Sequence, residues 1–326
     1  MMSLTRCSIT LIMLLFSTQI FAQLSTTELS NKSKGIELFN QFKTVSAIPF
    51  LSTAAKAGDS EAQYYLAESI RKNNRYMTQE AQSWYEASAE QGDLYAMIQL
   101  GRSNADICTA MQNCPQIKKQ PIEWLNQAQT IARQRAEQGN AEAMYIMYEA
   151  STEDGWLEKS ANAGYSIAQY WMGIRERQGE GSFIMPWKRS ESIEKWFKAS
   201  SEGGNPKAMM AYLEILYKNG DMNAVRHWIE EAAKTGDQDA ISSYGAYLSH
   251  TPDKIGLPLD LVKGYGLLLL LKELDGGGNV QAYLEDKLPE VSQKMTPQQI
   301  TDAKLFATQW KGTHPPLSFF PEKLSR

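Results

Sequence analysis

The chain has 326 residues, of which 43% are apolar and 21% are charged, a globular composition that excludes a disordered chain or a bundle of membrane spans. Its 33 Lys and Arg residues face 37 Asp and Glu residues, so it lacks the basic excess with which dedicated nucleic-acid-binding proteins neutralise phosphates. Only three His and three Cys are present, which is little material for a metal centre. We therefore expect no cofactor and no nucleic-acid partner.

Residues 1–22 have the pattern of a secretory signal peptide. Arg6 supplies one positive charge, a mostly apolar run follows from Ile9 to Phe21, and Ala22 is a small residue before Gln23. An uncleaved anchor is the alternative, which the shortness of the apolar run disfavours. We expect cleavage near Ala22, a periplasmic mature protein and no membrane span after cleavage.

A repeat runs through the rest of the chain. Each unit has a Gly followed four positions later by an Ala, and Asp or Asn usually follows the Gly. The pairs are Gly58/Ala62, Gly92/Ala96, Gly139/Ala143, Gly164/Ala168, Gly204/Ala208, Gly236/Ala240 and Gly278/Ala282. Such a Gly ends a helix in the left-handed conformation, the Asp or Asn caps the next helix, and the small Ala lets two helices approach closely. Four units carry a Trp eight positions before the Gly, which predicts buried rings at Trp84, Trp156, Trp196 and Trp228.

Helix pairs of this kind bury their apolar faces by stacking, so the pattern predicts an all-α, right-handed solenoid of antiparallel helix pairs. We expect an N-terminal capping helix region at 23–49, the repeat solenoid at 50–288, and a C-terminal capping helix and tail at 289–326. Thr is a common helix N-cap and Pro is common in the first turn, so Thr296 and Pro297 predict the start of the closing helix.

The longest unit, from Gly92 to Gly139, contains an insertion around Cys108 and Cys114. These two are the cysteines that remain after signal cleavage, and outside the cytosol such a pair is expected to form a disulfide. The unit from Gly139 to Gly164 is the shortest and lacks the usual long connection.

The repeat resembles the Sel-one-like repeat (SLR) family, a relative of the tetratricopeptide repeat. The segments that carry the resemblance are 84–93, 196–205 and 228–237, each with Trp at its start and a Gly followed by Asp or Asn at its end. The resemblance implies that the first helix of each pair lines a concave face that binds other proteins.

On this geometry, residues three, six and ten positions after each Gly are expected to face the groove. The candidate partner-binding residues are Glu61, Tyr64, Glu68, Tyr95, Glu142, Tyr145, Glu149 and Tyr170. They form an aromatic ladder flanked by carboxylates, suited to a protein partner. The alternative is that the tyrosines pack between neighbouring helices.

Motifs for catalysis are missing: the sequence has no phosphate loop, no His-Glu-x-x-His and no Gly-x-Ser-x-Gly, and its three His are isolated. We therefore expect a non-enzymatic periplasmic protein that binds a protein partner, and the resemblance suggests an immunity protein that neutralises a type VI secretion effector such as a phospholipase. An adaptor or negative regulator of envelope machinery or signalling, an enzyme acting on cell wall or β-lactams, and a polysaccharide-binding scaffold remain as alternatives. The oligomeric state stays open, as does the choice between the groove and the Cys108–Cys114 loop as the binding surface.

Overall fold

The computed structural model describes residues 24–151, 154–274 and 279–324, and these residues form seventeen α-helices and no strand. The predicted signal peptide at residues 1–22 and the repeat residue Gly278 lie outside them. The first helices of the successive pairs are α1 (Thr26–Asn40), α3 (Ser60–Asn74), α5 (Leu94–Gly101), α8 (Ala141–Ser151), α10 (Ser166–Arg177), α12 (Pro206–Lys218), α14 (Gln238–Leu248) and α16 (Val280–Ser292). Their partners are α2 (Thr44–Lys56), α4 (Gln79–Glu90), α7 (Pro121–Glu137), α9 (Asp154–Asn162), α11 (Pro186–Glu202), α13 (Met222–Lys234), α15 (Leu261–Leu270) and α17 (Pro297–Thr313). Among the described helices, none combines the length and the apolar character needed to cross a membrane.

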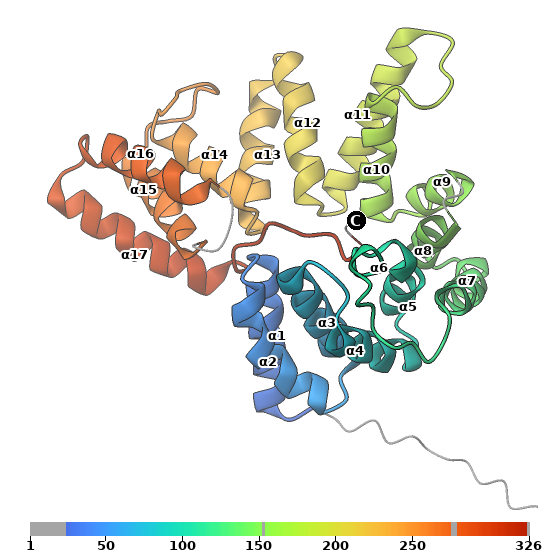
Figure 1. Cartoon of the computed structure of the whole chain (residues 1–326). Coiled ribbons are helices and arrows are strands. Elements are labelled where there is room, and N and C mark those ends of the chain that lie inside the picture. Colours follow the sequence, from blue (N-terminus) through green and yellow to red (C-terminus); the bar gives the residue numbers. More distant parts are fainter. Residues whose placement is uncertain (1–23, 152–153, 275–278, 325–326) are drawn as a thin grey trace, which may run out of the picture.

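From α1 to α5 and from α7 to α15, each helix packs against the next one along the chain, and the stack curves around a centre (Figure 1). The predicted fold class, an all-α solenoid of helix pairs, is confirmed.

The turns between pairs have the conformation that the repeat predicts. Each described repeat Gly has a positive φ, between 83° at Gly204 and 94° at Gly58. The Asp59, Asp93 and Asp237 carboxylates accept hydrogen bonds from the backbone N–H three residues on, as N-caps do. Local chemistry at the turns therefore sets the helix boundaries.

The repeated Trp positions are buried to different degrees. Trp196 is 7% exposed, which confirms the prediction for this ring. The prediction is wrong in part for Trp84, Trp156 and Trp228, which pack against the core but are only partly buried. At Trp156 the Lys159 ammonium lies 4.2 Å from the ring centroid, so a cation covers part of the ring.

The insertion of the longest unit forms the short helix α6 (Cys108–Met111), and the predicted Cys108–Cys114 disulfide is present. At the other end of the chain, α17 starts at the predicted Thr296 cap. The Thr296 side chain accepts from the Gln299 N–H, and the Gln299 side chain accepts from the Thr296 N–H.

The chain does not stop at α17. Residues 314–324, named here the tail, cross the centre of the molecule, with α1 and α3 on one side and α12 and α13 on the other, and reach the neighbourhood of α5, α8 and α10 (Figure 1). The predicted C-terminal tail thus lies in the middle of the concave face.

Candidate functional site

The concave face collects the predicted partner-binding residues from four successive first helices. Glu61, Tyr64 and Glu68 come from α3, Tyr95 from α5, Glu142, Tyr145 and Glu149 from α8, and Tyr170 from α10. Their role in binding a partner stays a prediction, but the structure shows that all of them lie near or beneath the tail.

The tail is held on this face through its main chain. The Tyr64 hydroxyl and the Gln99 side-chain amide both donate to the Lys323 carbonyl oxygen, the latter at 3.4 Å. The Arg102 guanidinium donates to the Leu324 carbonyl oxygen at 3.4 Å. Because these three donors come from α3 and from the end of α5, the face presents an array of side chains that bind polypeptide main chain.

The first part of the tail, residues 315–319, is hydrogen-bonded to two distant parts of the solenoid and is named here the anchor. The Ser318 N–H donates to the Gly236 carbonyl at 2.9 Å, and the Phe319 N–H donates to the Asn40 carbonyl at 3.0 Å. Leu317 is 5% exposed, and the Phe319 ring stacks on Phe42 with centroids 4.5 Å apart. The anchor therefore joins the end of α1 to the start of α14.

The second part, residues 320–324, is named here the distal tail. It begins at Phe320, whose φ of 46° lies in the left-handed region that a bulky aromatic residue disfavours. Pro321 follows, and the segment ends at the buried Leu324. A strained residue thus separates the anchor from the part that enters the groove.

Glu68 lies beneath the distal tail and is only 1% exposed. Its carboxylate accepts from the Tyr85 hydroxyl at 2.7 Å, from the Gln99 amide at 2.6 Å and from Arg71 at 3.2 Å. A partner would not reach Glu68 while this network holds. The residue therefore orients Gln99, one of the main-chain donors of the groove, from below.

Two of the predicted tyrosines are also nearly covered: Tyr64 is 1% exposed and Tyr145 is 5% exposed. Burial raises the pKa of both hydroxyls, and neighbouring carboxylates raise them further. Both hydroxyls therefore stay protonated and available as donors. For Tyr64 the alternative prediction of packing between helices also describes the structure.

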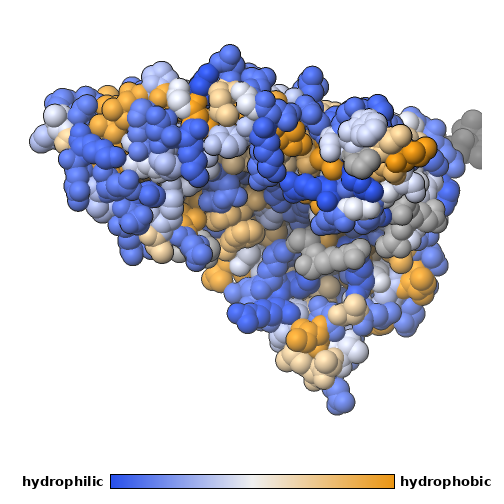
Figure 2. Space-filling model, turned by 90° about the horizontal axis from the view of Figure 1, so that it is seen from above, coloured by the Kyte–Doolittle hydropathy of each residue, from blue (hydrophilic) through white to orange (hydrophobic). Residues whose placement is uncertain are grey.

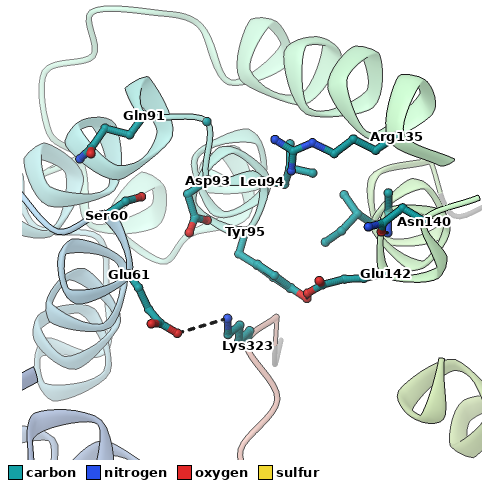
Figure 3. Close-up of a pocket in the computed structure, with 13 residues that line it drawn as sticks. Ser60, Glu61, Gln91, Asp93, Leu94, Tyr95, Arg135, Asn140, Glu142 and Lys323 are labelled. Carbon is teal, nitrogen blue, oxygen red and sulfur yellow. Dashed lines mark hydrogen bonds and ion pairs between the residues drawn. The ribbon is translucent and has the colours of Figure 1, made fainter. Parts of the chain in front are cut away.

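A pocket of about 340 Å³ opens where α3, α5 and α8 meet the distal tail (Figure 3). Glu61, Asp93 and Glu142 line it, and the Lys323 ammonium enters it. The Lys323 Nζ lies 3.9 Å from a Glu61 carboxylate oxygen and 4.7 Å from the centroid of the Tyr95 ring. Carboxylates and an aromatic ring thus surround a cation on several sides.

A second cavity, of about 430 Å³, lies between the distal tail and the helices α8, α10 and α12. Tyr145, Tyr165 and Tyr170 are among its aromatic residues, and its charged residues are Glu142, Lys207, Glu322 and Lys323. Burial raises the pKa of the Glu322 carboxyl, while the Lys207 ammonium opposes the shift. The tail is a wall of this cavity, so the groove is not filled completely.

Reasoning from the repeat missed Gln99 and the whole of the distal tail, and it placed Arg102, ten positions after Gly92, in the groove register without naming it as a binding residue. Gln99 lies one position beyond the expected groove register, and the tail lies outside every repeat. The signals available were the apolar Leu317 and Leu324 in a segment with three Pro residues, which keep a chain extended. These signals do not say where the segment docks.

Asp237, which caps α14 beside the anchor, supports a pH prediction. Burial raises its pKa from 3.8 to about 6, and Asp239 adds to the shift while the cap bond and Lys207 oppose it. Because the folded pKa is the higher one, ionisation favours the unfolded chain, and stability falls as the pH rises from about 4 to about 6. Asp237→Asn keeps a capping side chain, so we expect it to stabilise the protein by about 2 kcal/mol near neutral pH.

That gain should shrink to less than about 1 kcal/mol at about pH 4, where Asp237 is protonated in the folded wild type. Denaturant unfolding of both proteins at the two pH values measures it. A gain of the same size at both would show that the ionisation of Asp237 has no part in it.

No protein-family description and no curated protein matches the chain. Two solved structures resemble it. The first is c5321, a protective antigen of uropathogenic Escherichia coli with an SLR fold, at 18% identity and a TM-score of 0.47, over 89% of this chain and 62% of that one. The second is a Sel1 repeat protein from Oxalobacter formigenes, at 21% identity and a TM-score of 0.38, over 73% of this chain and 95% of that one.

The chain thus spans less than two thirds of the length of the E. coli antigen. The recurrent helix pairs, with their left-handed Gly and their Asp or Asn caps, have the SLR architecture that the repeat motif predicted.

Proposed function

We propose that the protein is a non-enzymatic binding protein that holds an extended segment of a protein partner in its concave groove. One observation carries the proposal: Tyr64, Gln99 and Arg102 already donate to two consecutive main-chain carbonyls of the distal tail, at Lys323 and Leu324. Main-chain carbonyls are common to all polypeptides, so the same donors can serve a segment of another protein. The tyrosines around the second cavity offer the large, rigid contact area that protein interfaces favour.

We propose further that binding takes place in the periplasm. The predicted signal at residues 1–22 supports export, and a bonded Cys108–Cys114 pair is the state that an oxidising compartment favours. Protein recovered from a periplasmic fraction should begin at Gln23. An N-terminal sequence that still contains Arg6 would contradict this part of the proposal.

Within this class, the partner that we propose is a secreted toxic effector such as a phospholipase, which the protein would neutralise as an immunity protein. An adaptor or negative regulator of envelope machinery is the alternative. The two alternatives are distinguished by mixing the purified protein with a lipase-like toxin encoded beside its gene and measuring the lipase activity of the toxin. Stoichiometric inhibition supports immunity, and full residual activity rejects it.

Substitutions in the groove test the binding surface. Glu142 is exposed, so Glu142→Lys should slow association and weaken its salt dependence. Tyr170→Ala should instead raise the dissociation rate. If the Tyr170 ring lies at the centre of the interface, we expect the variant to lose about 2 kcal/mol of binding free energy. Glu149 is unsuitable for charge reversal because its carboxylate pairs with Arg102 at 2.6 Å and thereby supports a groove donor.

Surface plasmon resonance with the partner measures both rates, and Glu90→Lys on the exposed side of α4 is the matched control. Unchanged binding in both groove variants, with folded protein, would reject the groove as the binding surface.

The insertion is the second candidate surface, because it exposes large apolar side chains. Ile107 is 54% exposed, Met111 53% and Ile117 41%. Apolar side chains also reach the face seen in Figure 2 in small separate patches between hydrophilic regions. Loss of binding in Met111→Ser with an unaffected Tyr170→Ala would move the site to the insertion.

A further inference from the structure

Building on the proposed groove, we infer that the distal tail is an internal competitor, and that the groove recognises a partner segment carrying Lys or Arg followed directly by an aliphatic residue. In the structure the pair Lys323 and Leu324 takes these two roles. The inference rests on the proposed function and adds the chemistry of the partner to it.

The first half of the recognition pair is a cation site. The Lys323 ammonium points into the pocket between Glu61 and the Tyr95–Glu142 pair (Figure 3). It lies 4.7 Å from the Tyr95 ring centroid and 5.8 Å from that of Tyr65, so two aromatic rings flank it.

The carboxylates complete this site. Glu61 is shared between Lys323, at 3.9 Å, and Lys32, at 3.0 Å. Glu142 accepts from the Tyr95 hydroxyl at 2.5 Å, which holds the ring in place beside the cation. Asp93 lines the same pocket. The built environment therefore suits a long side chain with a positive end.

The second half is an apolar site next to it. Leu324 is 7% exposed and belongs to the core cluster that includes Tyr64, Leu100 and Ile146. The Arg102 guanidinium that binds its carbonyl also pairs with Glu149, so the donor is fixed by the protein. An aliphatic side chain at this position buries nearly all of its surface, whereas a polar one would lose its hydration.

The way in which the distal tail is attached allows it to be replaced. The anchor holds the chain through Ser318 and Phe319, upstream of the strained Phe320. Release of residues 320–324 relieves the left-handed conformation of Phe320 and leaves the anchor bonds intact. A partner segment therefore competes with a short, strained stretch and not with the whole tail.

A chain ending at Phe319 tests the inference, because it retains the anchor and opens the groove. The probe is a fluorescent peptide with the sequence of residues 319–324, together with a second probe in which only the Lys-Leu pair is kept and the other positions are Gly and Ser. Both probes should bind the shortened chain. They should bind the full chain at least about tenfold more weakly, because there the distal tail competes for the groove.

Replacing Lys by Gln in either probe should weaken binding about three- to tenfold, replacing it by Arg should preserve binding, and replacing Leu by Ser should weaken it about tenfold. Glu61→Gln in the shortened chain should weaken the Lys probes selectively, and Glu90→Gln is the matched control. In the full chain, Lys323→Gln combined with Leu324→Ser should restore probe binding without any truncation.

Failure of both probes to bind a shortened chain that retains its helical circular dichroism spectrum would overturn the inference, as would equal binding to the full and shortened chains. Neither result touches the proposed function, which fails separately if Glu142→Lys and Tyr170→Ala leave the binding of the protein partner unchanged. The two failures are therefore distinguishable.

Discussion

Trp196→Ala is expected to lower the free energy of unfolding by about 3–5 kcal/mol, the usual cost of deleting a buried aromatic ring. The ring is 7% exposed and packs in a cluster with Tyr145, Leu157 and Ala168, so its removal leaves a cavity between helix pairs. Its indole N–H also donates to a Glu176 carboxylate oxygen at 3.1 Å. Glu176 is itself 7% exposed, and a buried carboxylate without its donor adds to the cost.

The same helix supplies the control. Trp187 lies at the start of α11 and is 57% exposed, so Trp187→Ala should change stability by no more than about 0.5 kcal/mol. Denaturant unfolding followed by circular dichroism compares the two variants. If Trp196→Ala unfolded at the same midpoint as Trp187→Ala, the position would not be a packing position of the repeat.

Ending the chain at Thr313 should cost about 4–6 kcal/mol, whereas ending it at Phe319 should cost about half of that. The longer deletion removes two buried Leu side chains, each worth roughly 1.5–3 kcal/mol, and the shorter one removes only Leu324. Only the longer deletion also removes the anchor bonds from Ser318 to Gly236 and from Phe319 to Asn40.

The anchor joins distant parts of a solenoid whose other contacts are mostly between neighbours, so its loss should also make unfolding less cooperative. Thermal scans of the three chain lengths measure both effects. Equal midpoints and equally steep transitions in all three would show that the tail rests on the concave face without stabilising it.

The sequence by itself determined the helix pairs of this protein, because their signals are local. A Gly that tolerates a positive φ, an Asp or Asn within reach of the next N–H groups and a small Ala one turn later act within a few residues. The same locality explains the Thr296 cap of α17 and the disulfide of the insertion. The repeat also predicted which positions of the first helices face the groove. The structure places four of these residues around one cavity: Tyr95, Glu142, Tyr145 and Tyr170.

The sequence predicted the exposure of individual side chains less well. Trp84, Trp156 and Trp228 occupy the same repeat position as Trp196 but remain partly exposed, because the repeats differ in length and the neighbouring helix does not cover each ring equally. Glu68 was expected at the groove surface and lies under it, since Tyr85 and Gln99 from neighbouring helices and Arg71 from its own helix surround its carboxylate.

Only the tertiary structure decided where the tail lies. Tyr64 and Lys323 are 259 positions apart, and the contact between them leaves no periodic or local trace in the sequence. The path of the tail depends on the curvature of the whole stack, which brings α1, α3 and α14 around one centre, and this curvature sums small rotations at every pair. The local chemistry of the repeat therefore determines which residues line the groove. The curvature of the whole solenoid determines that the tail occupies it.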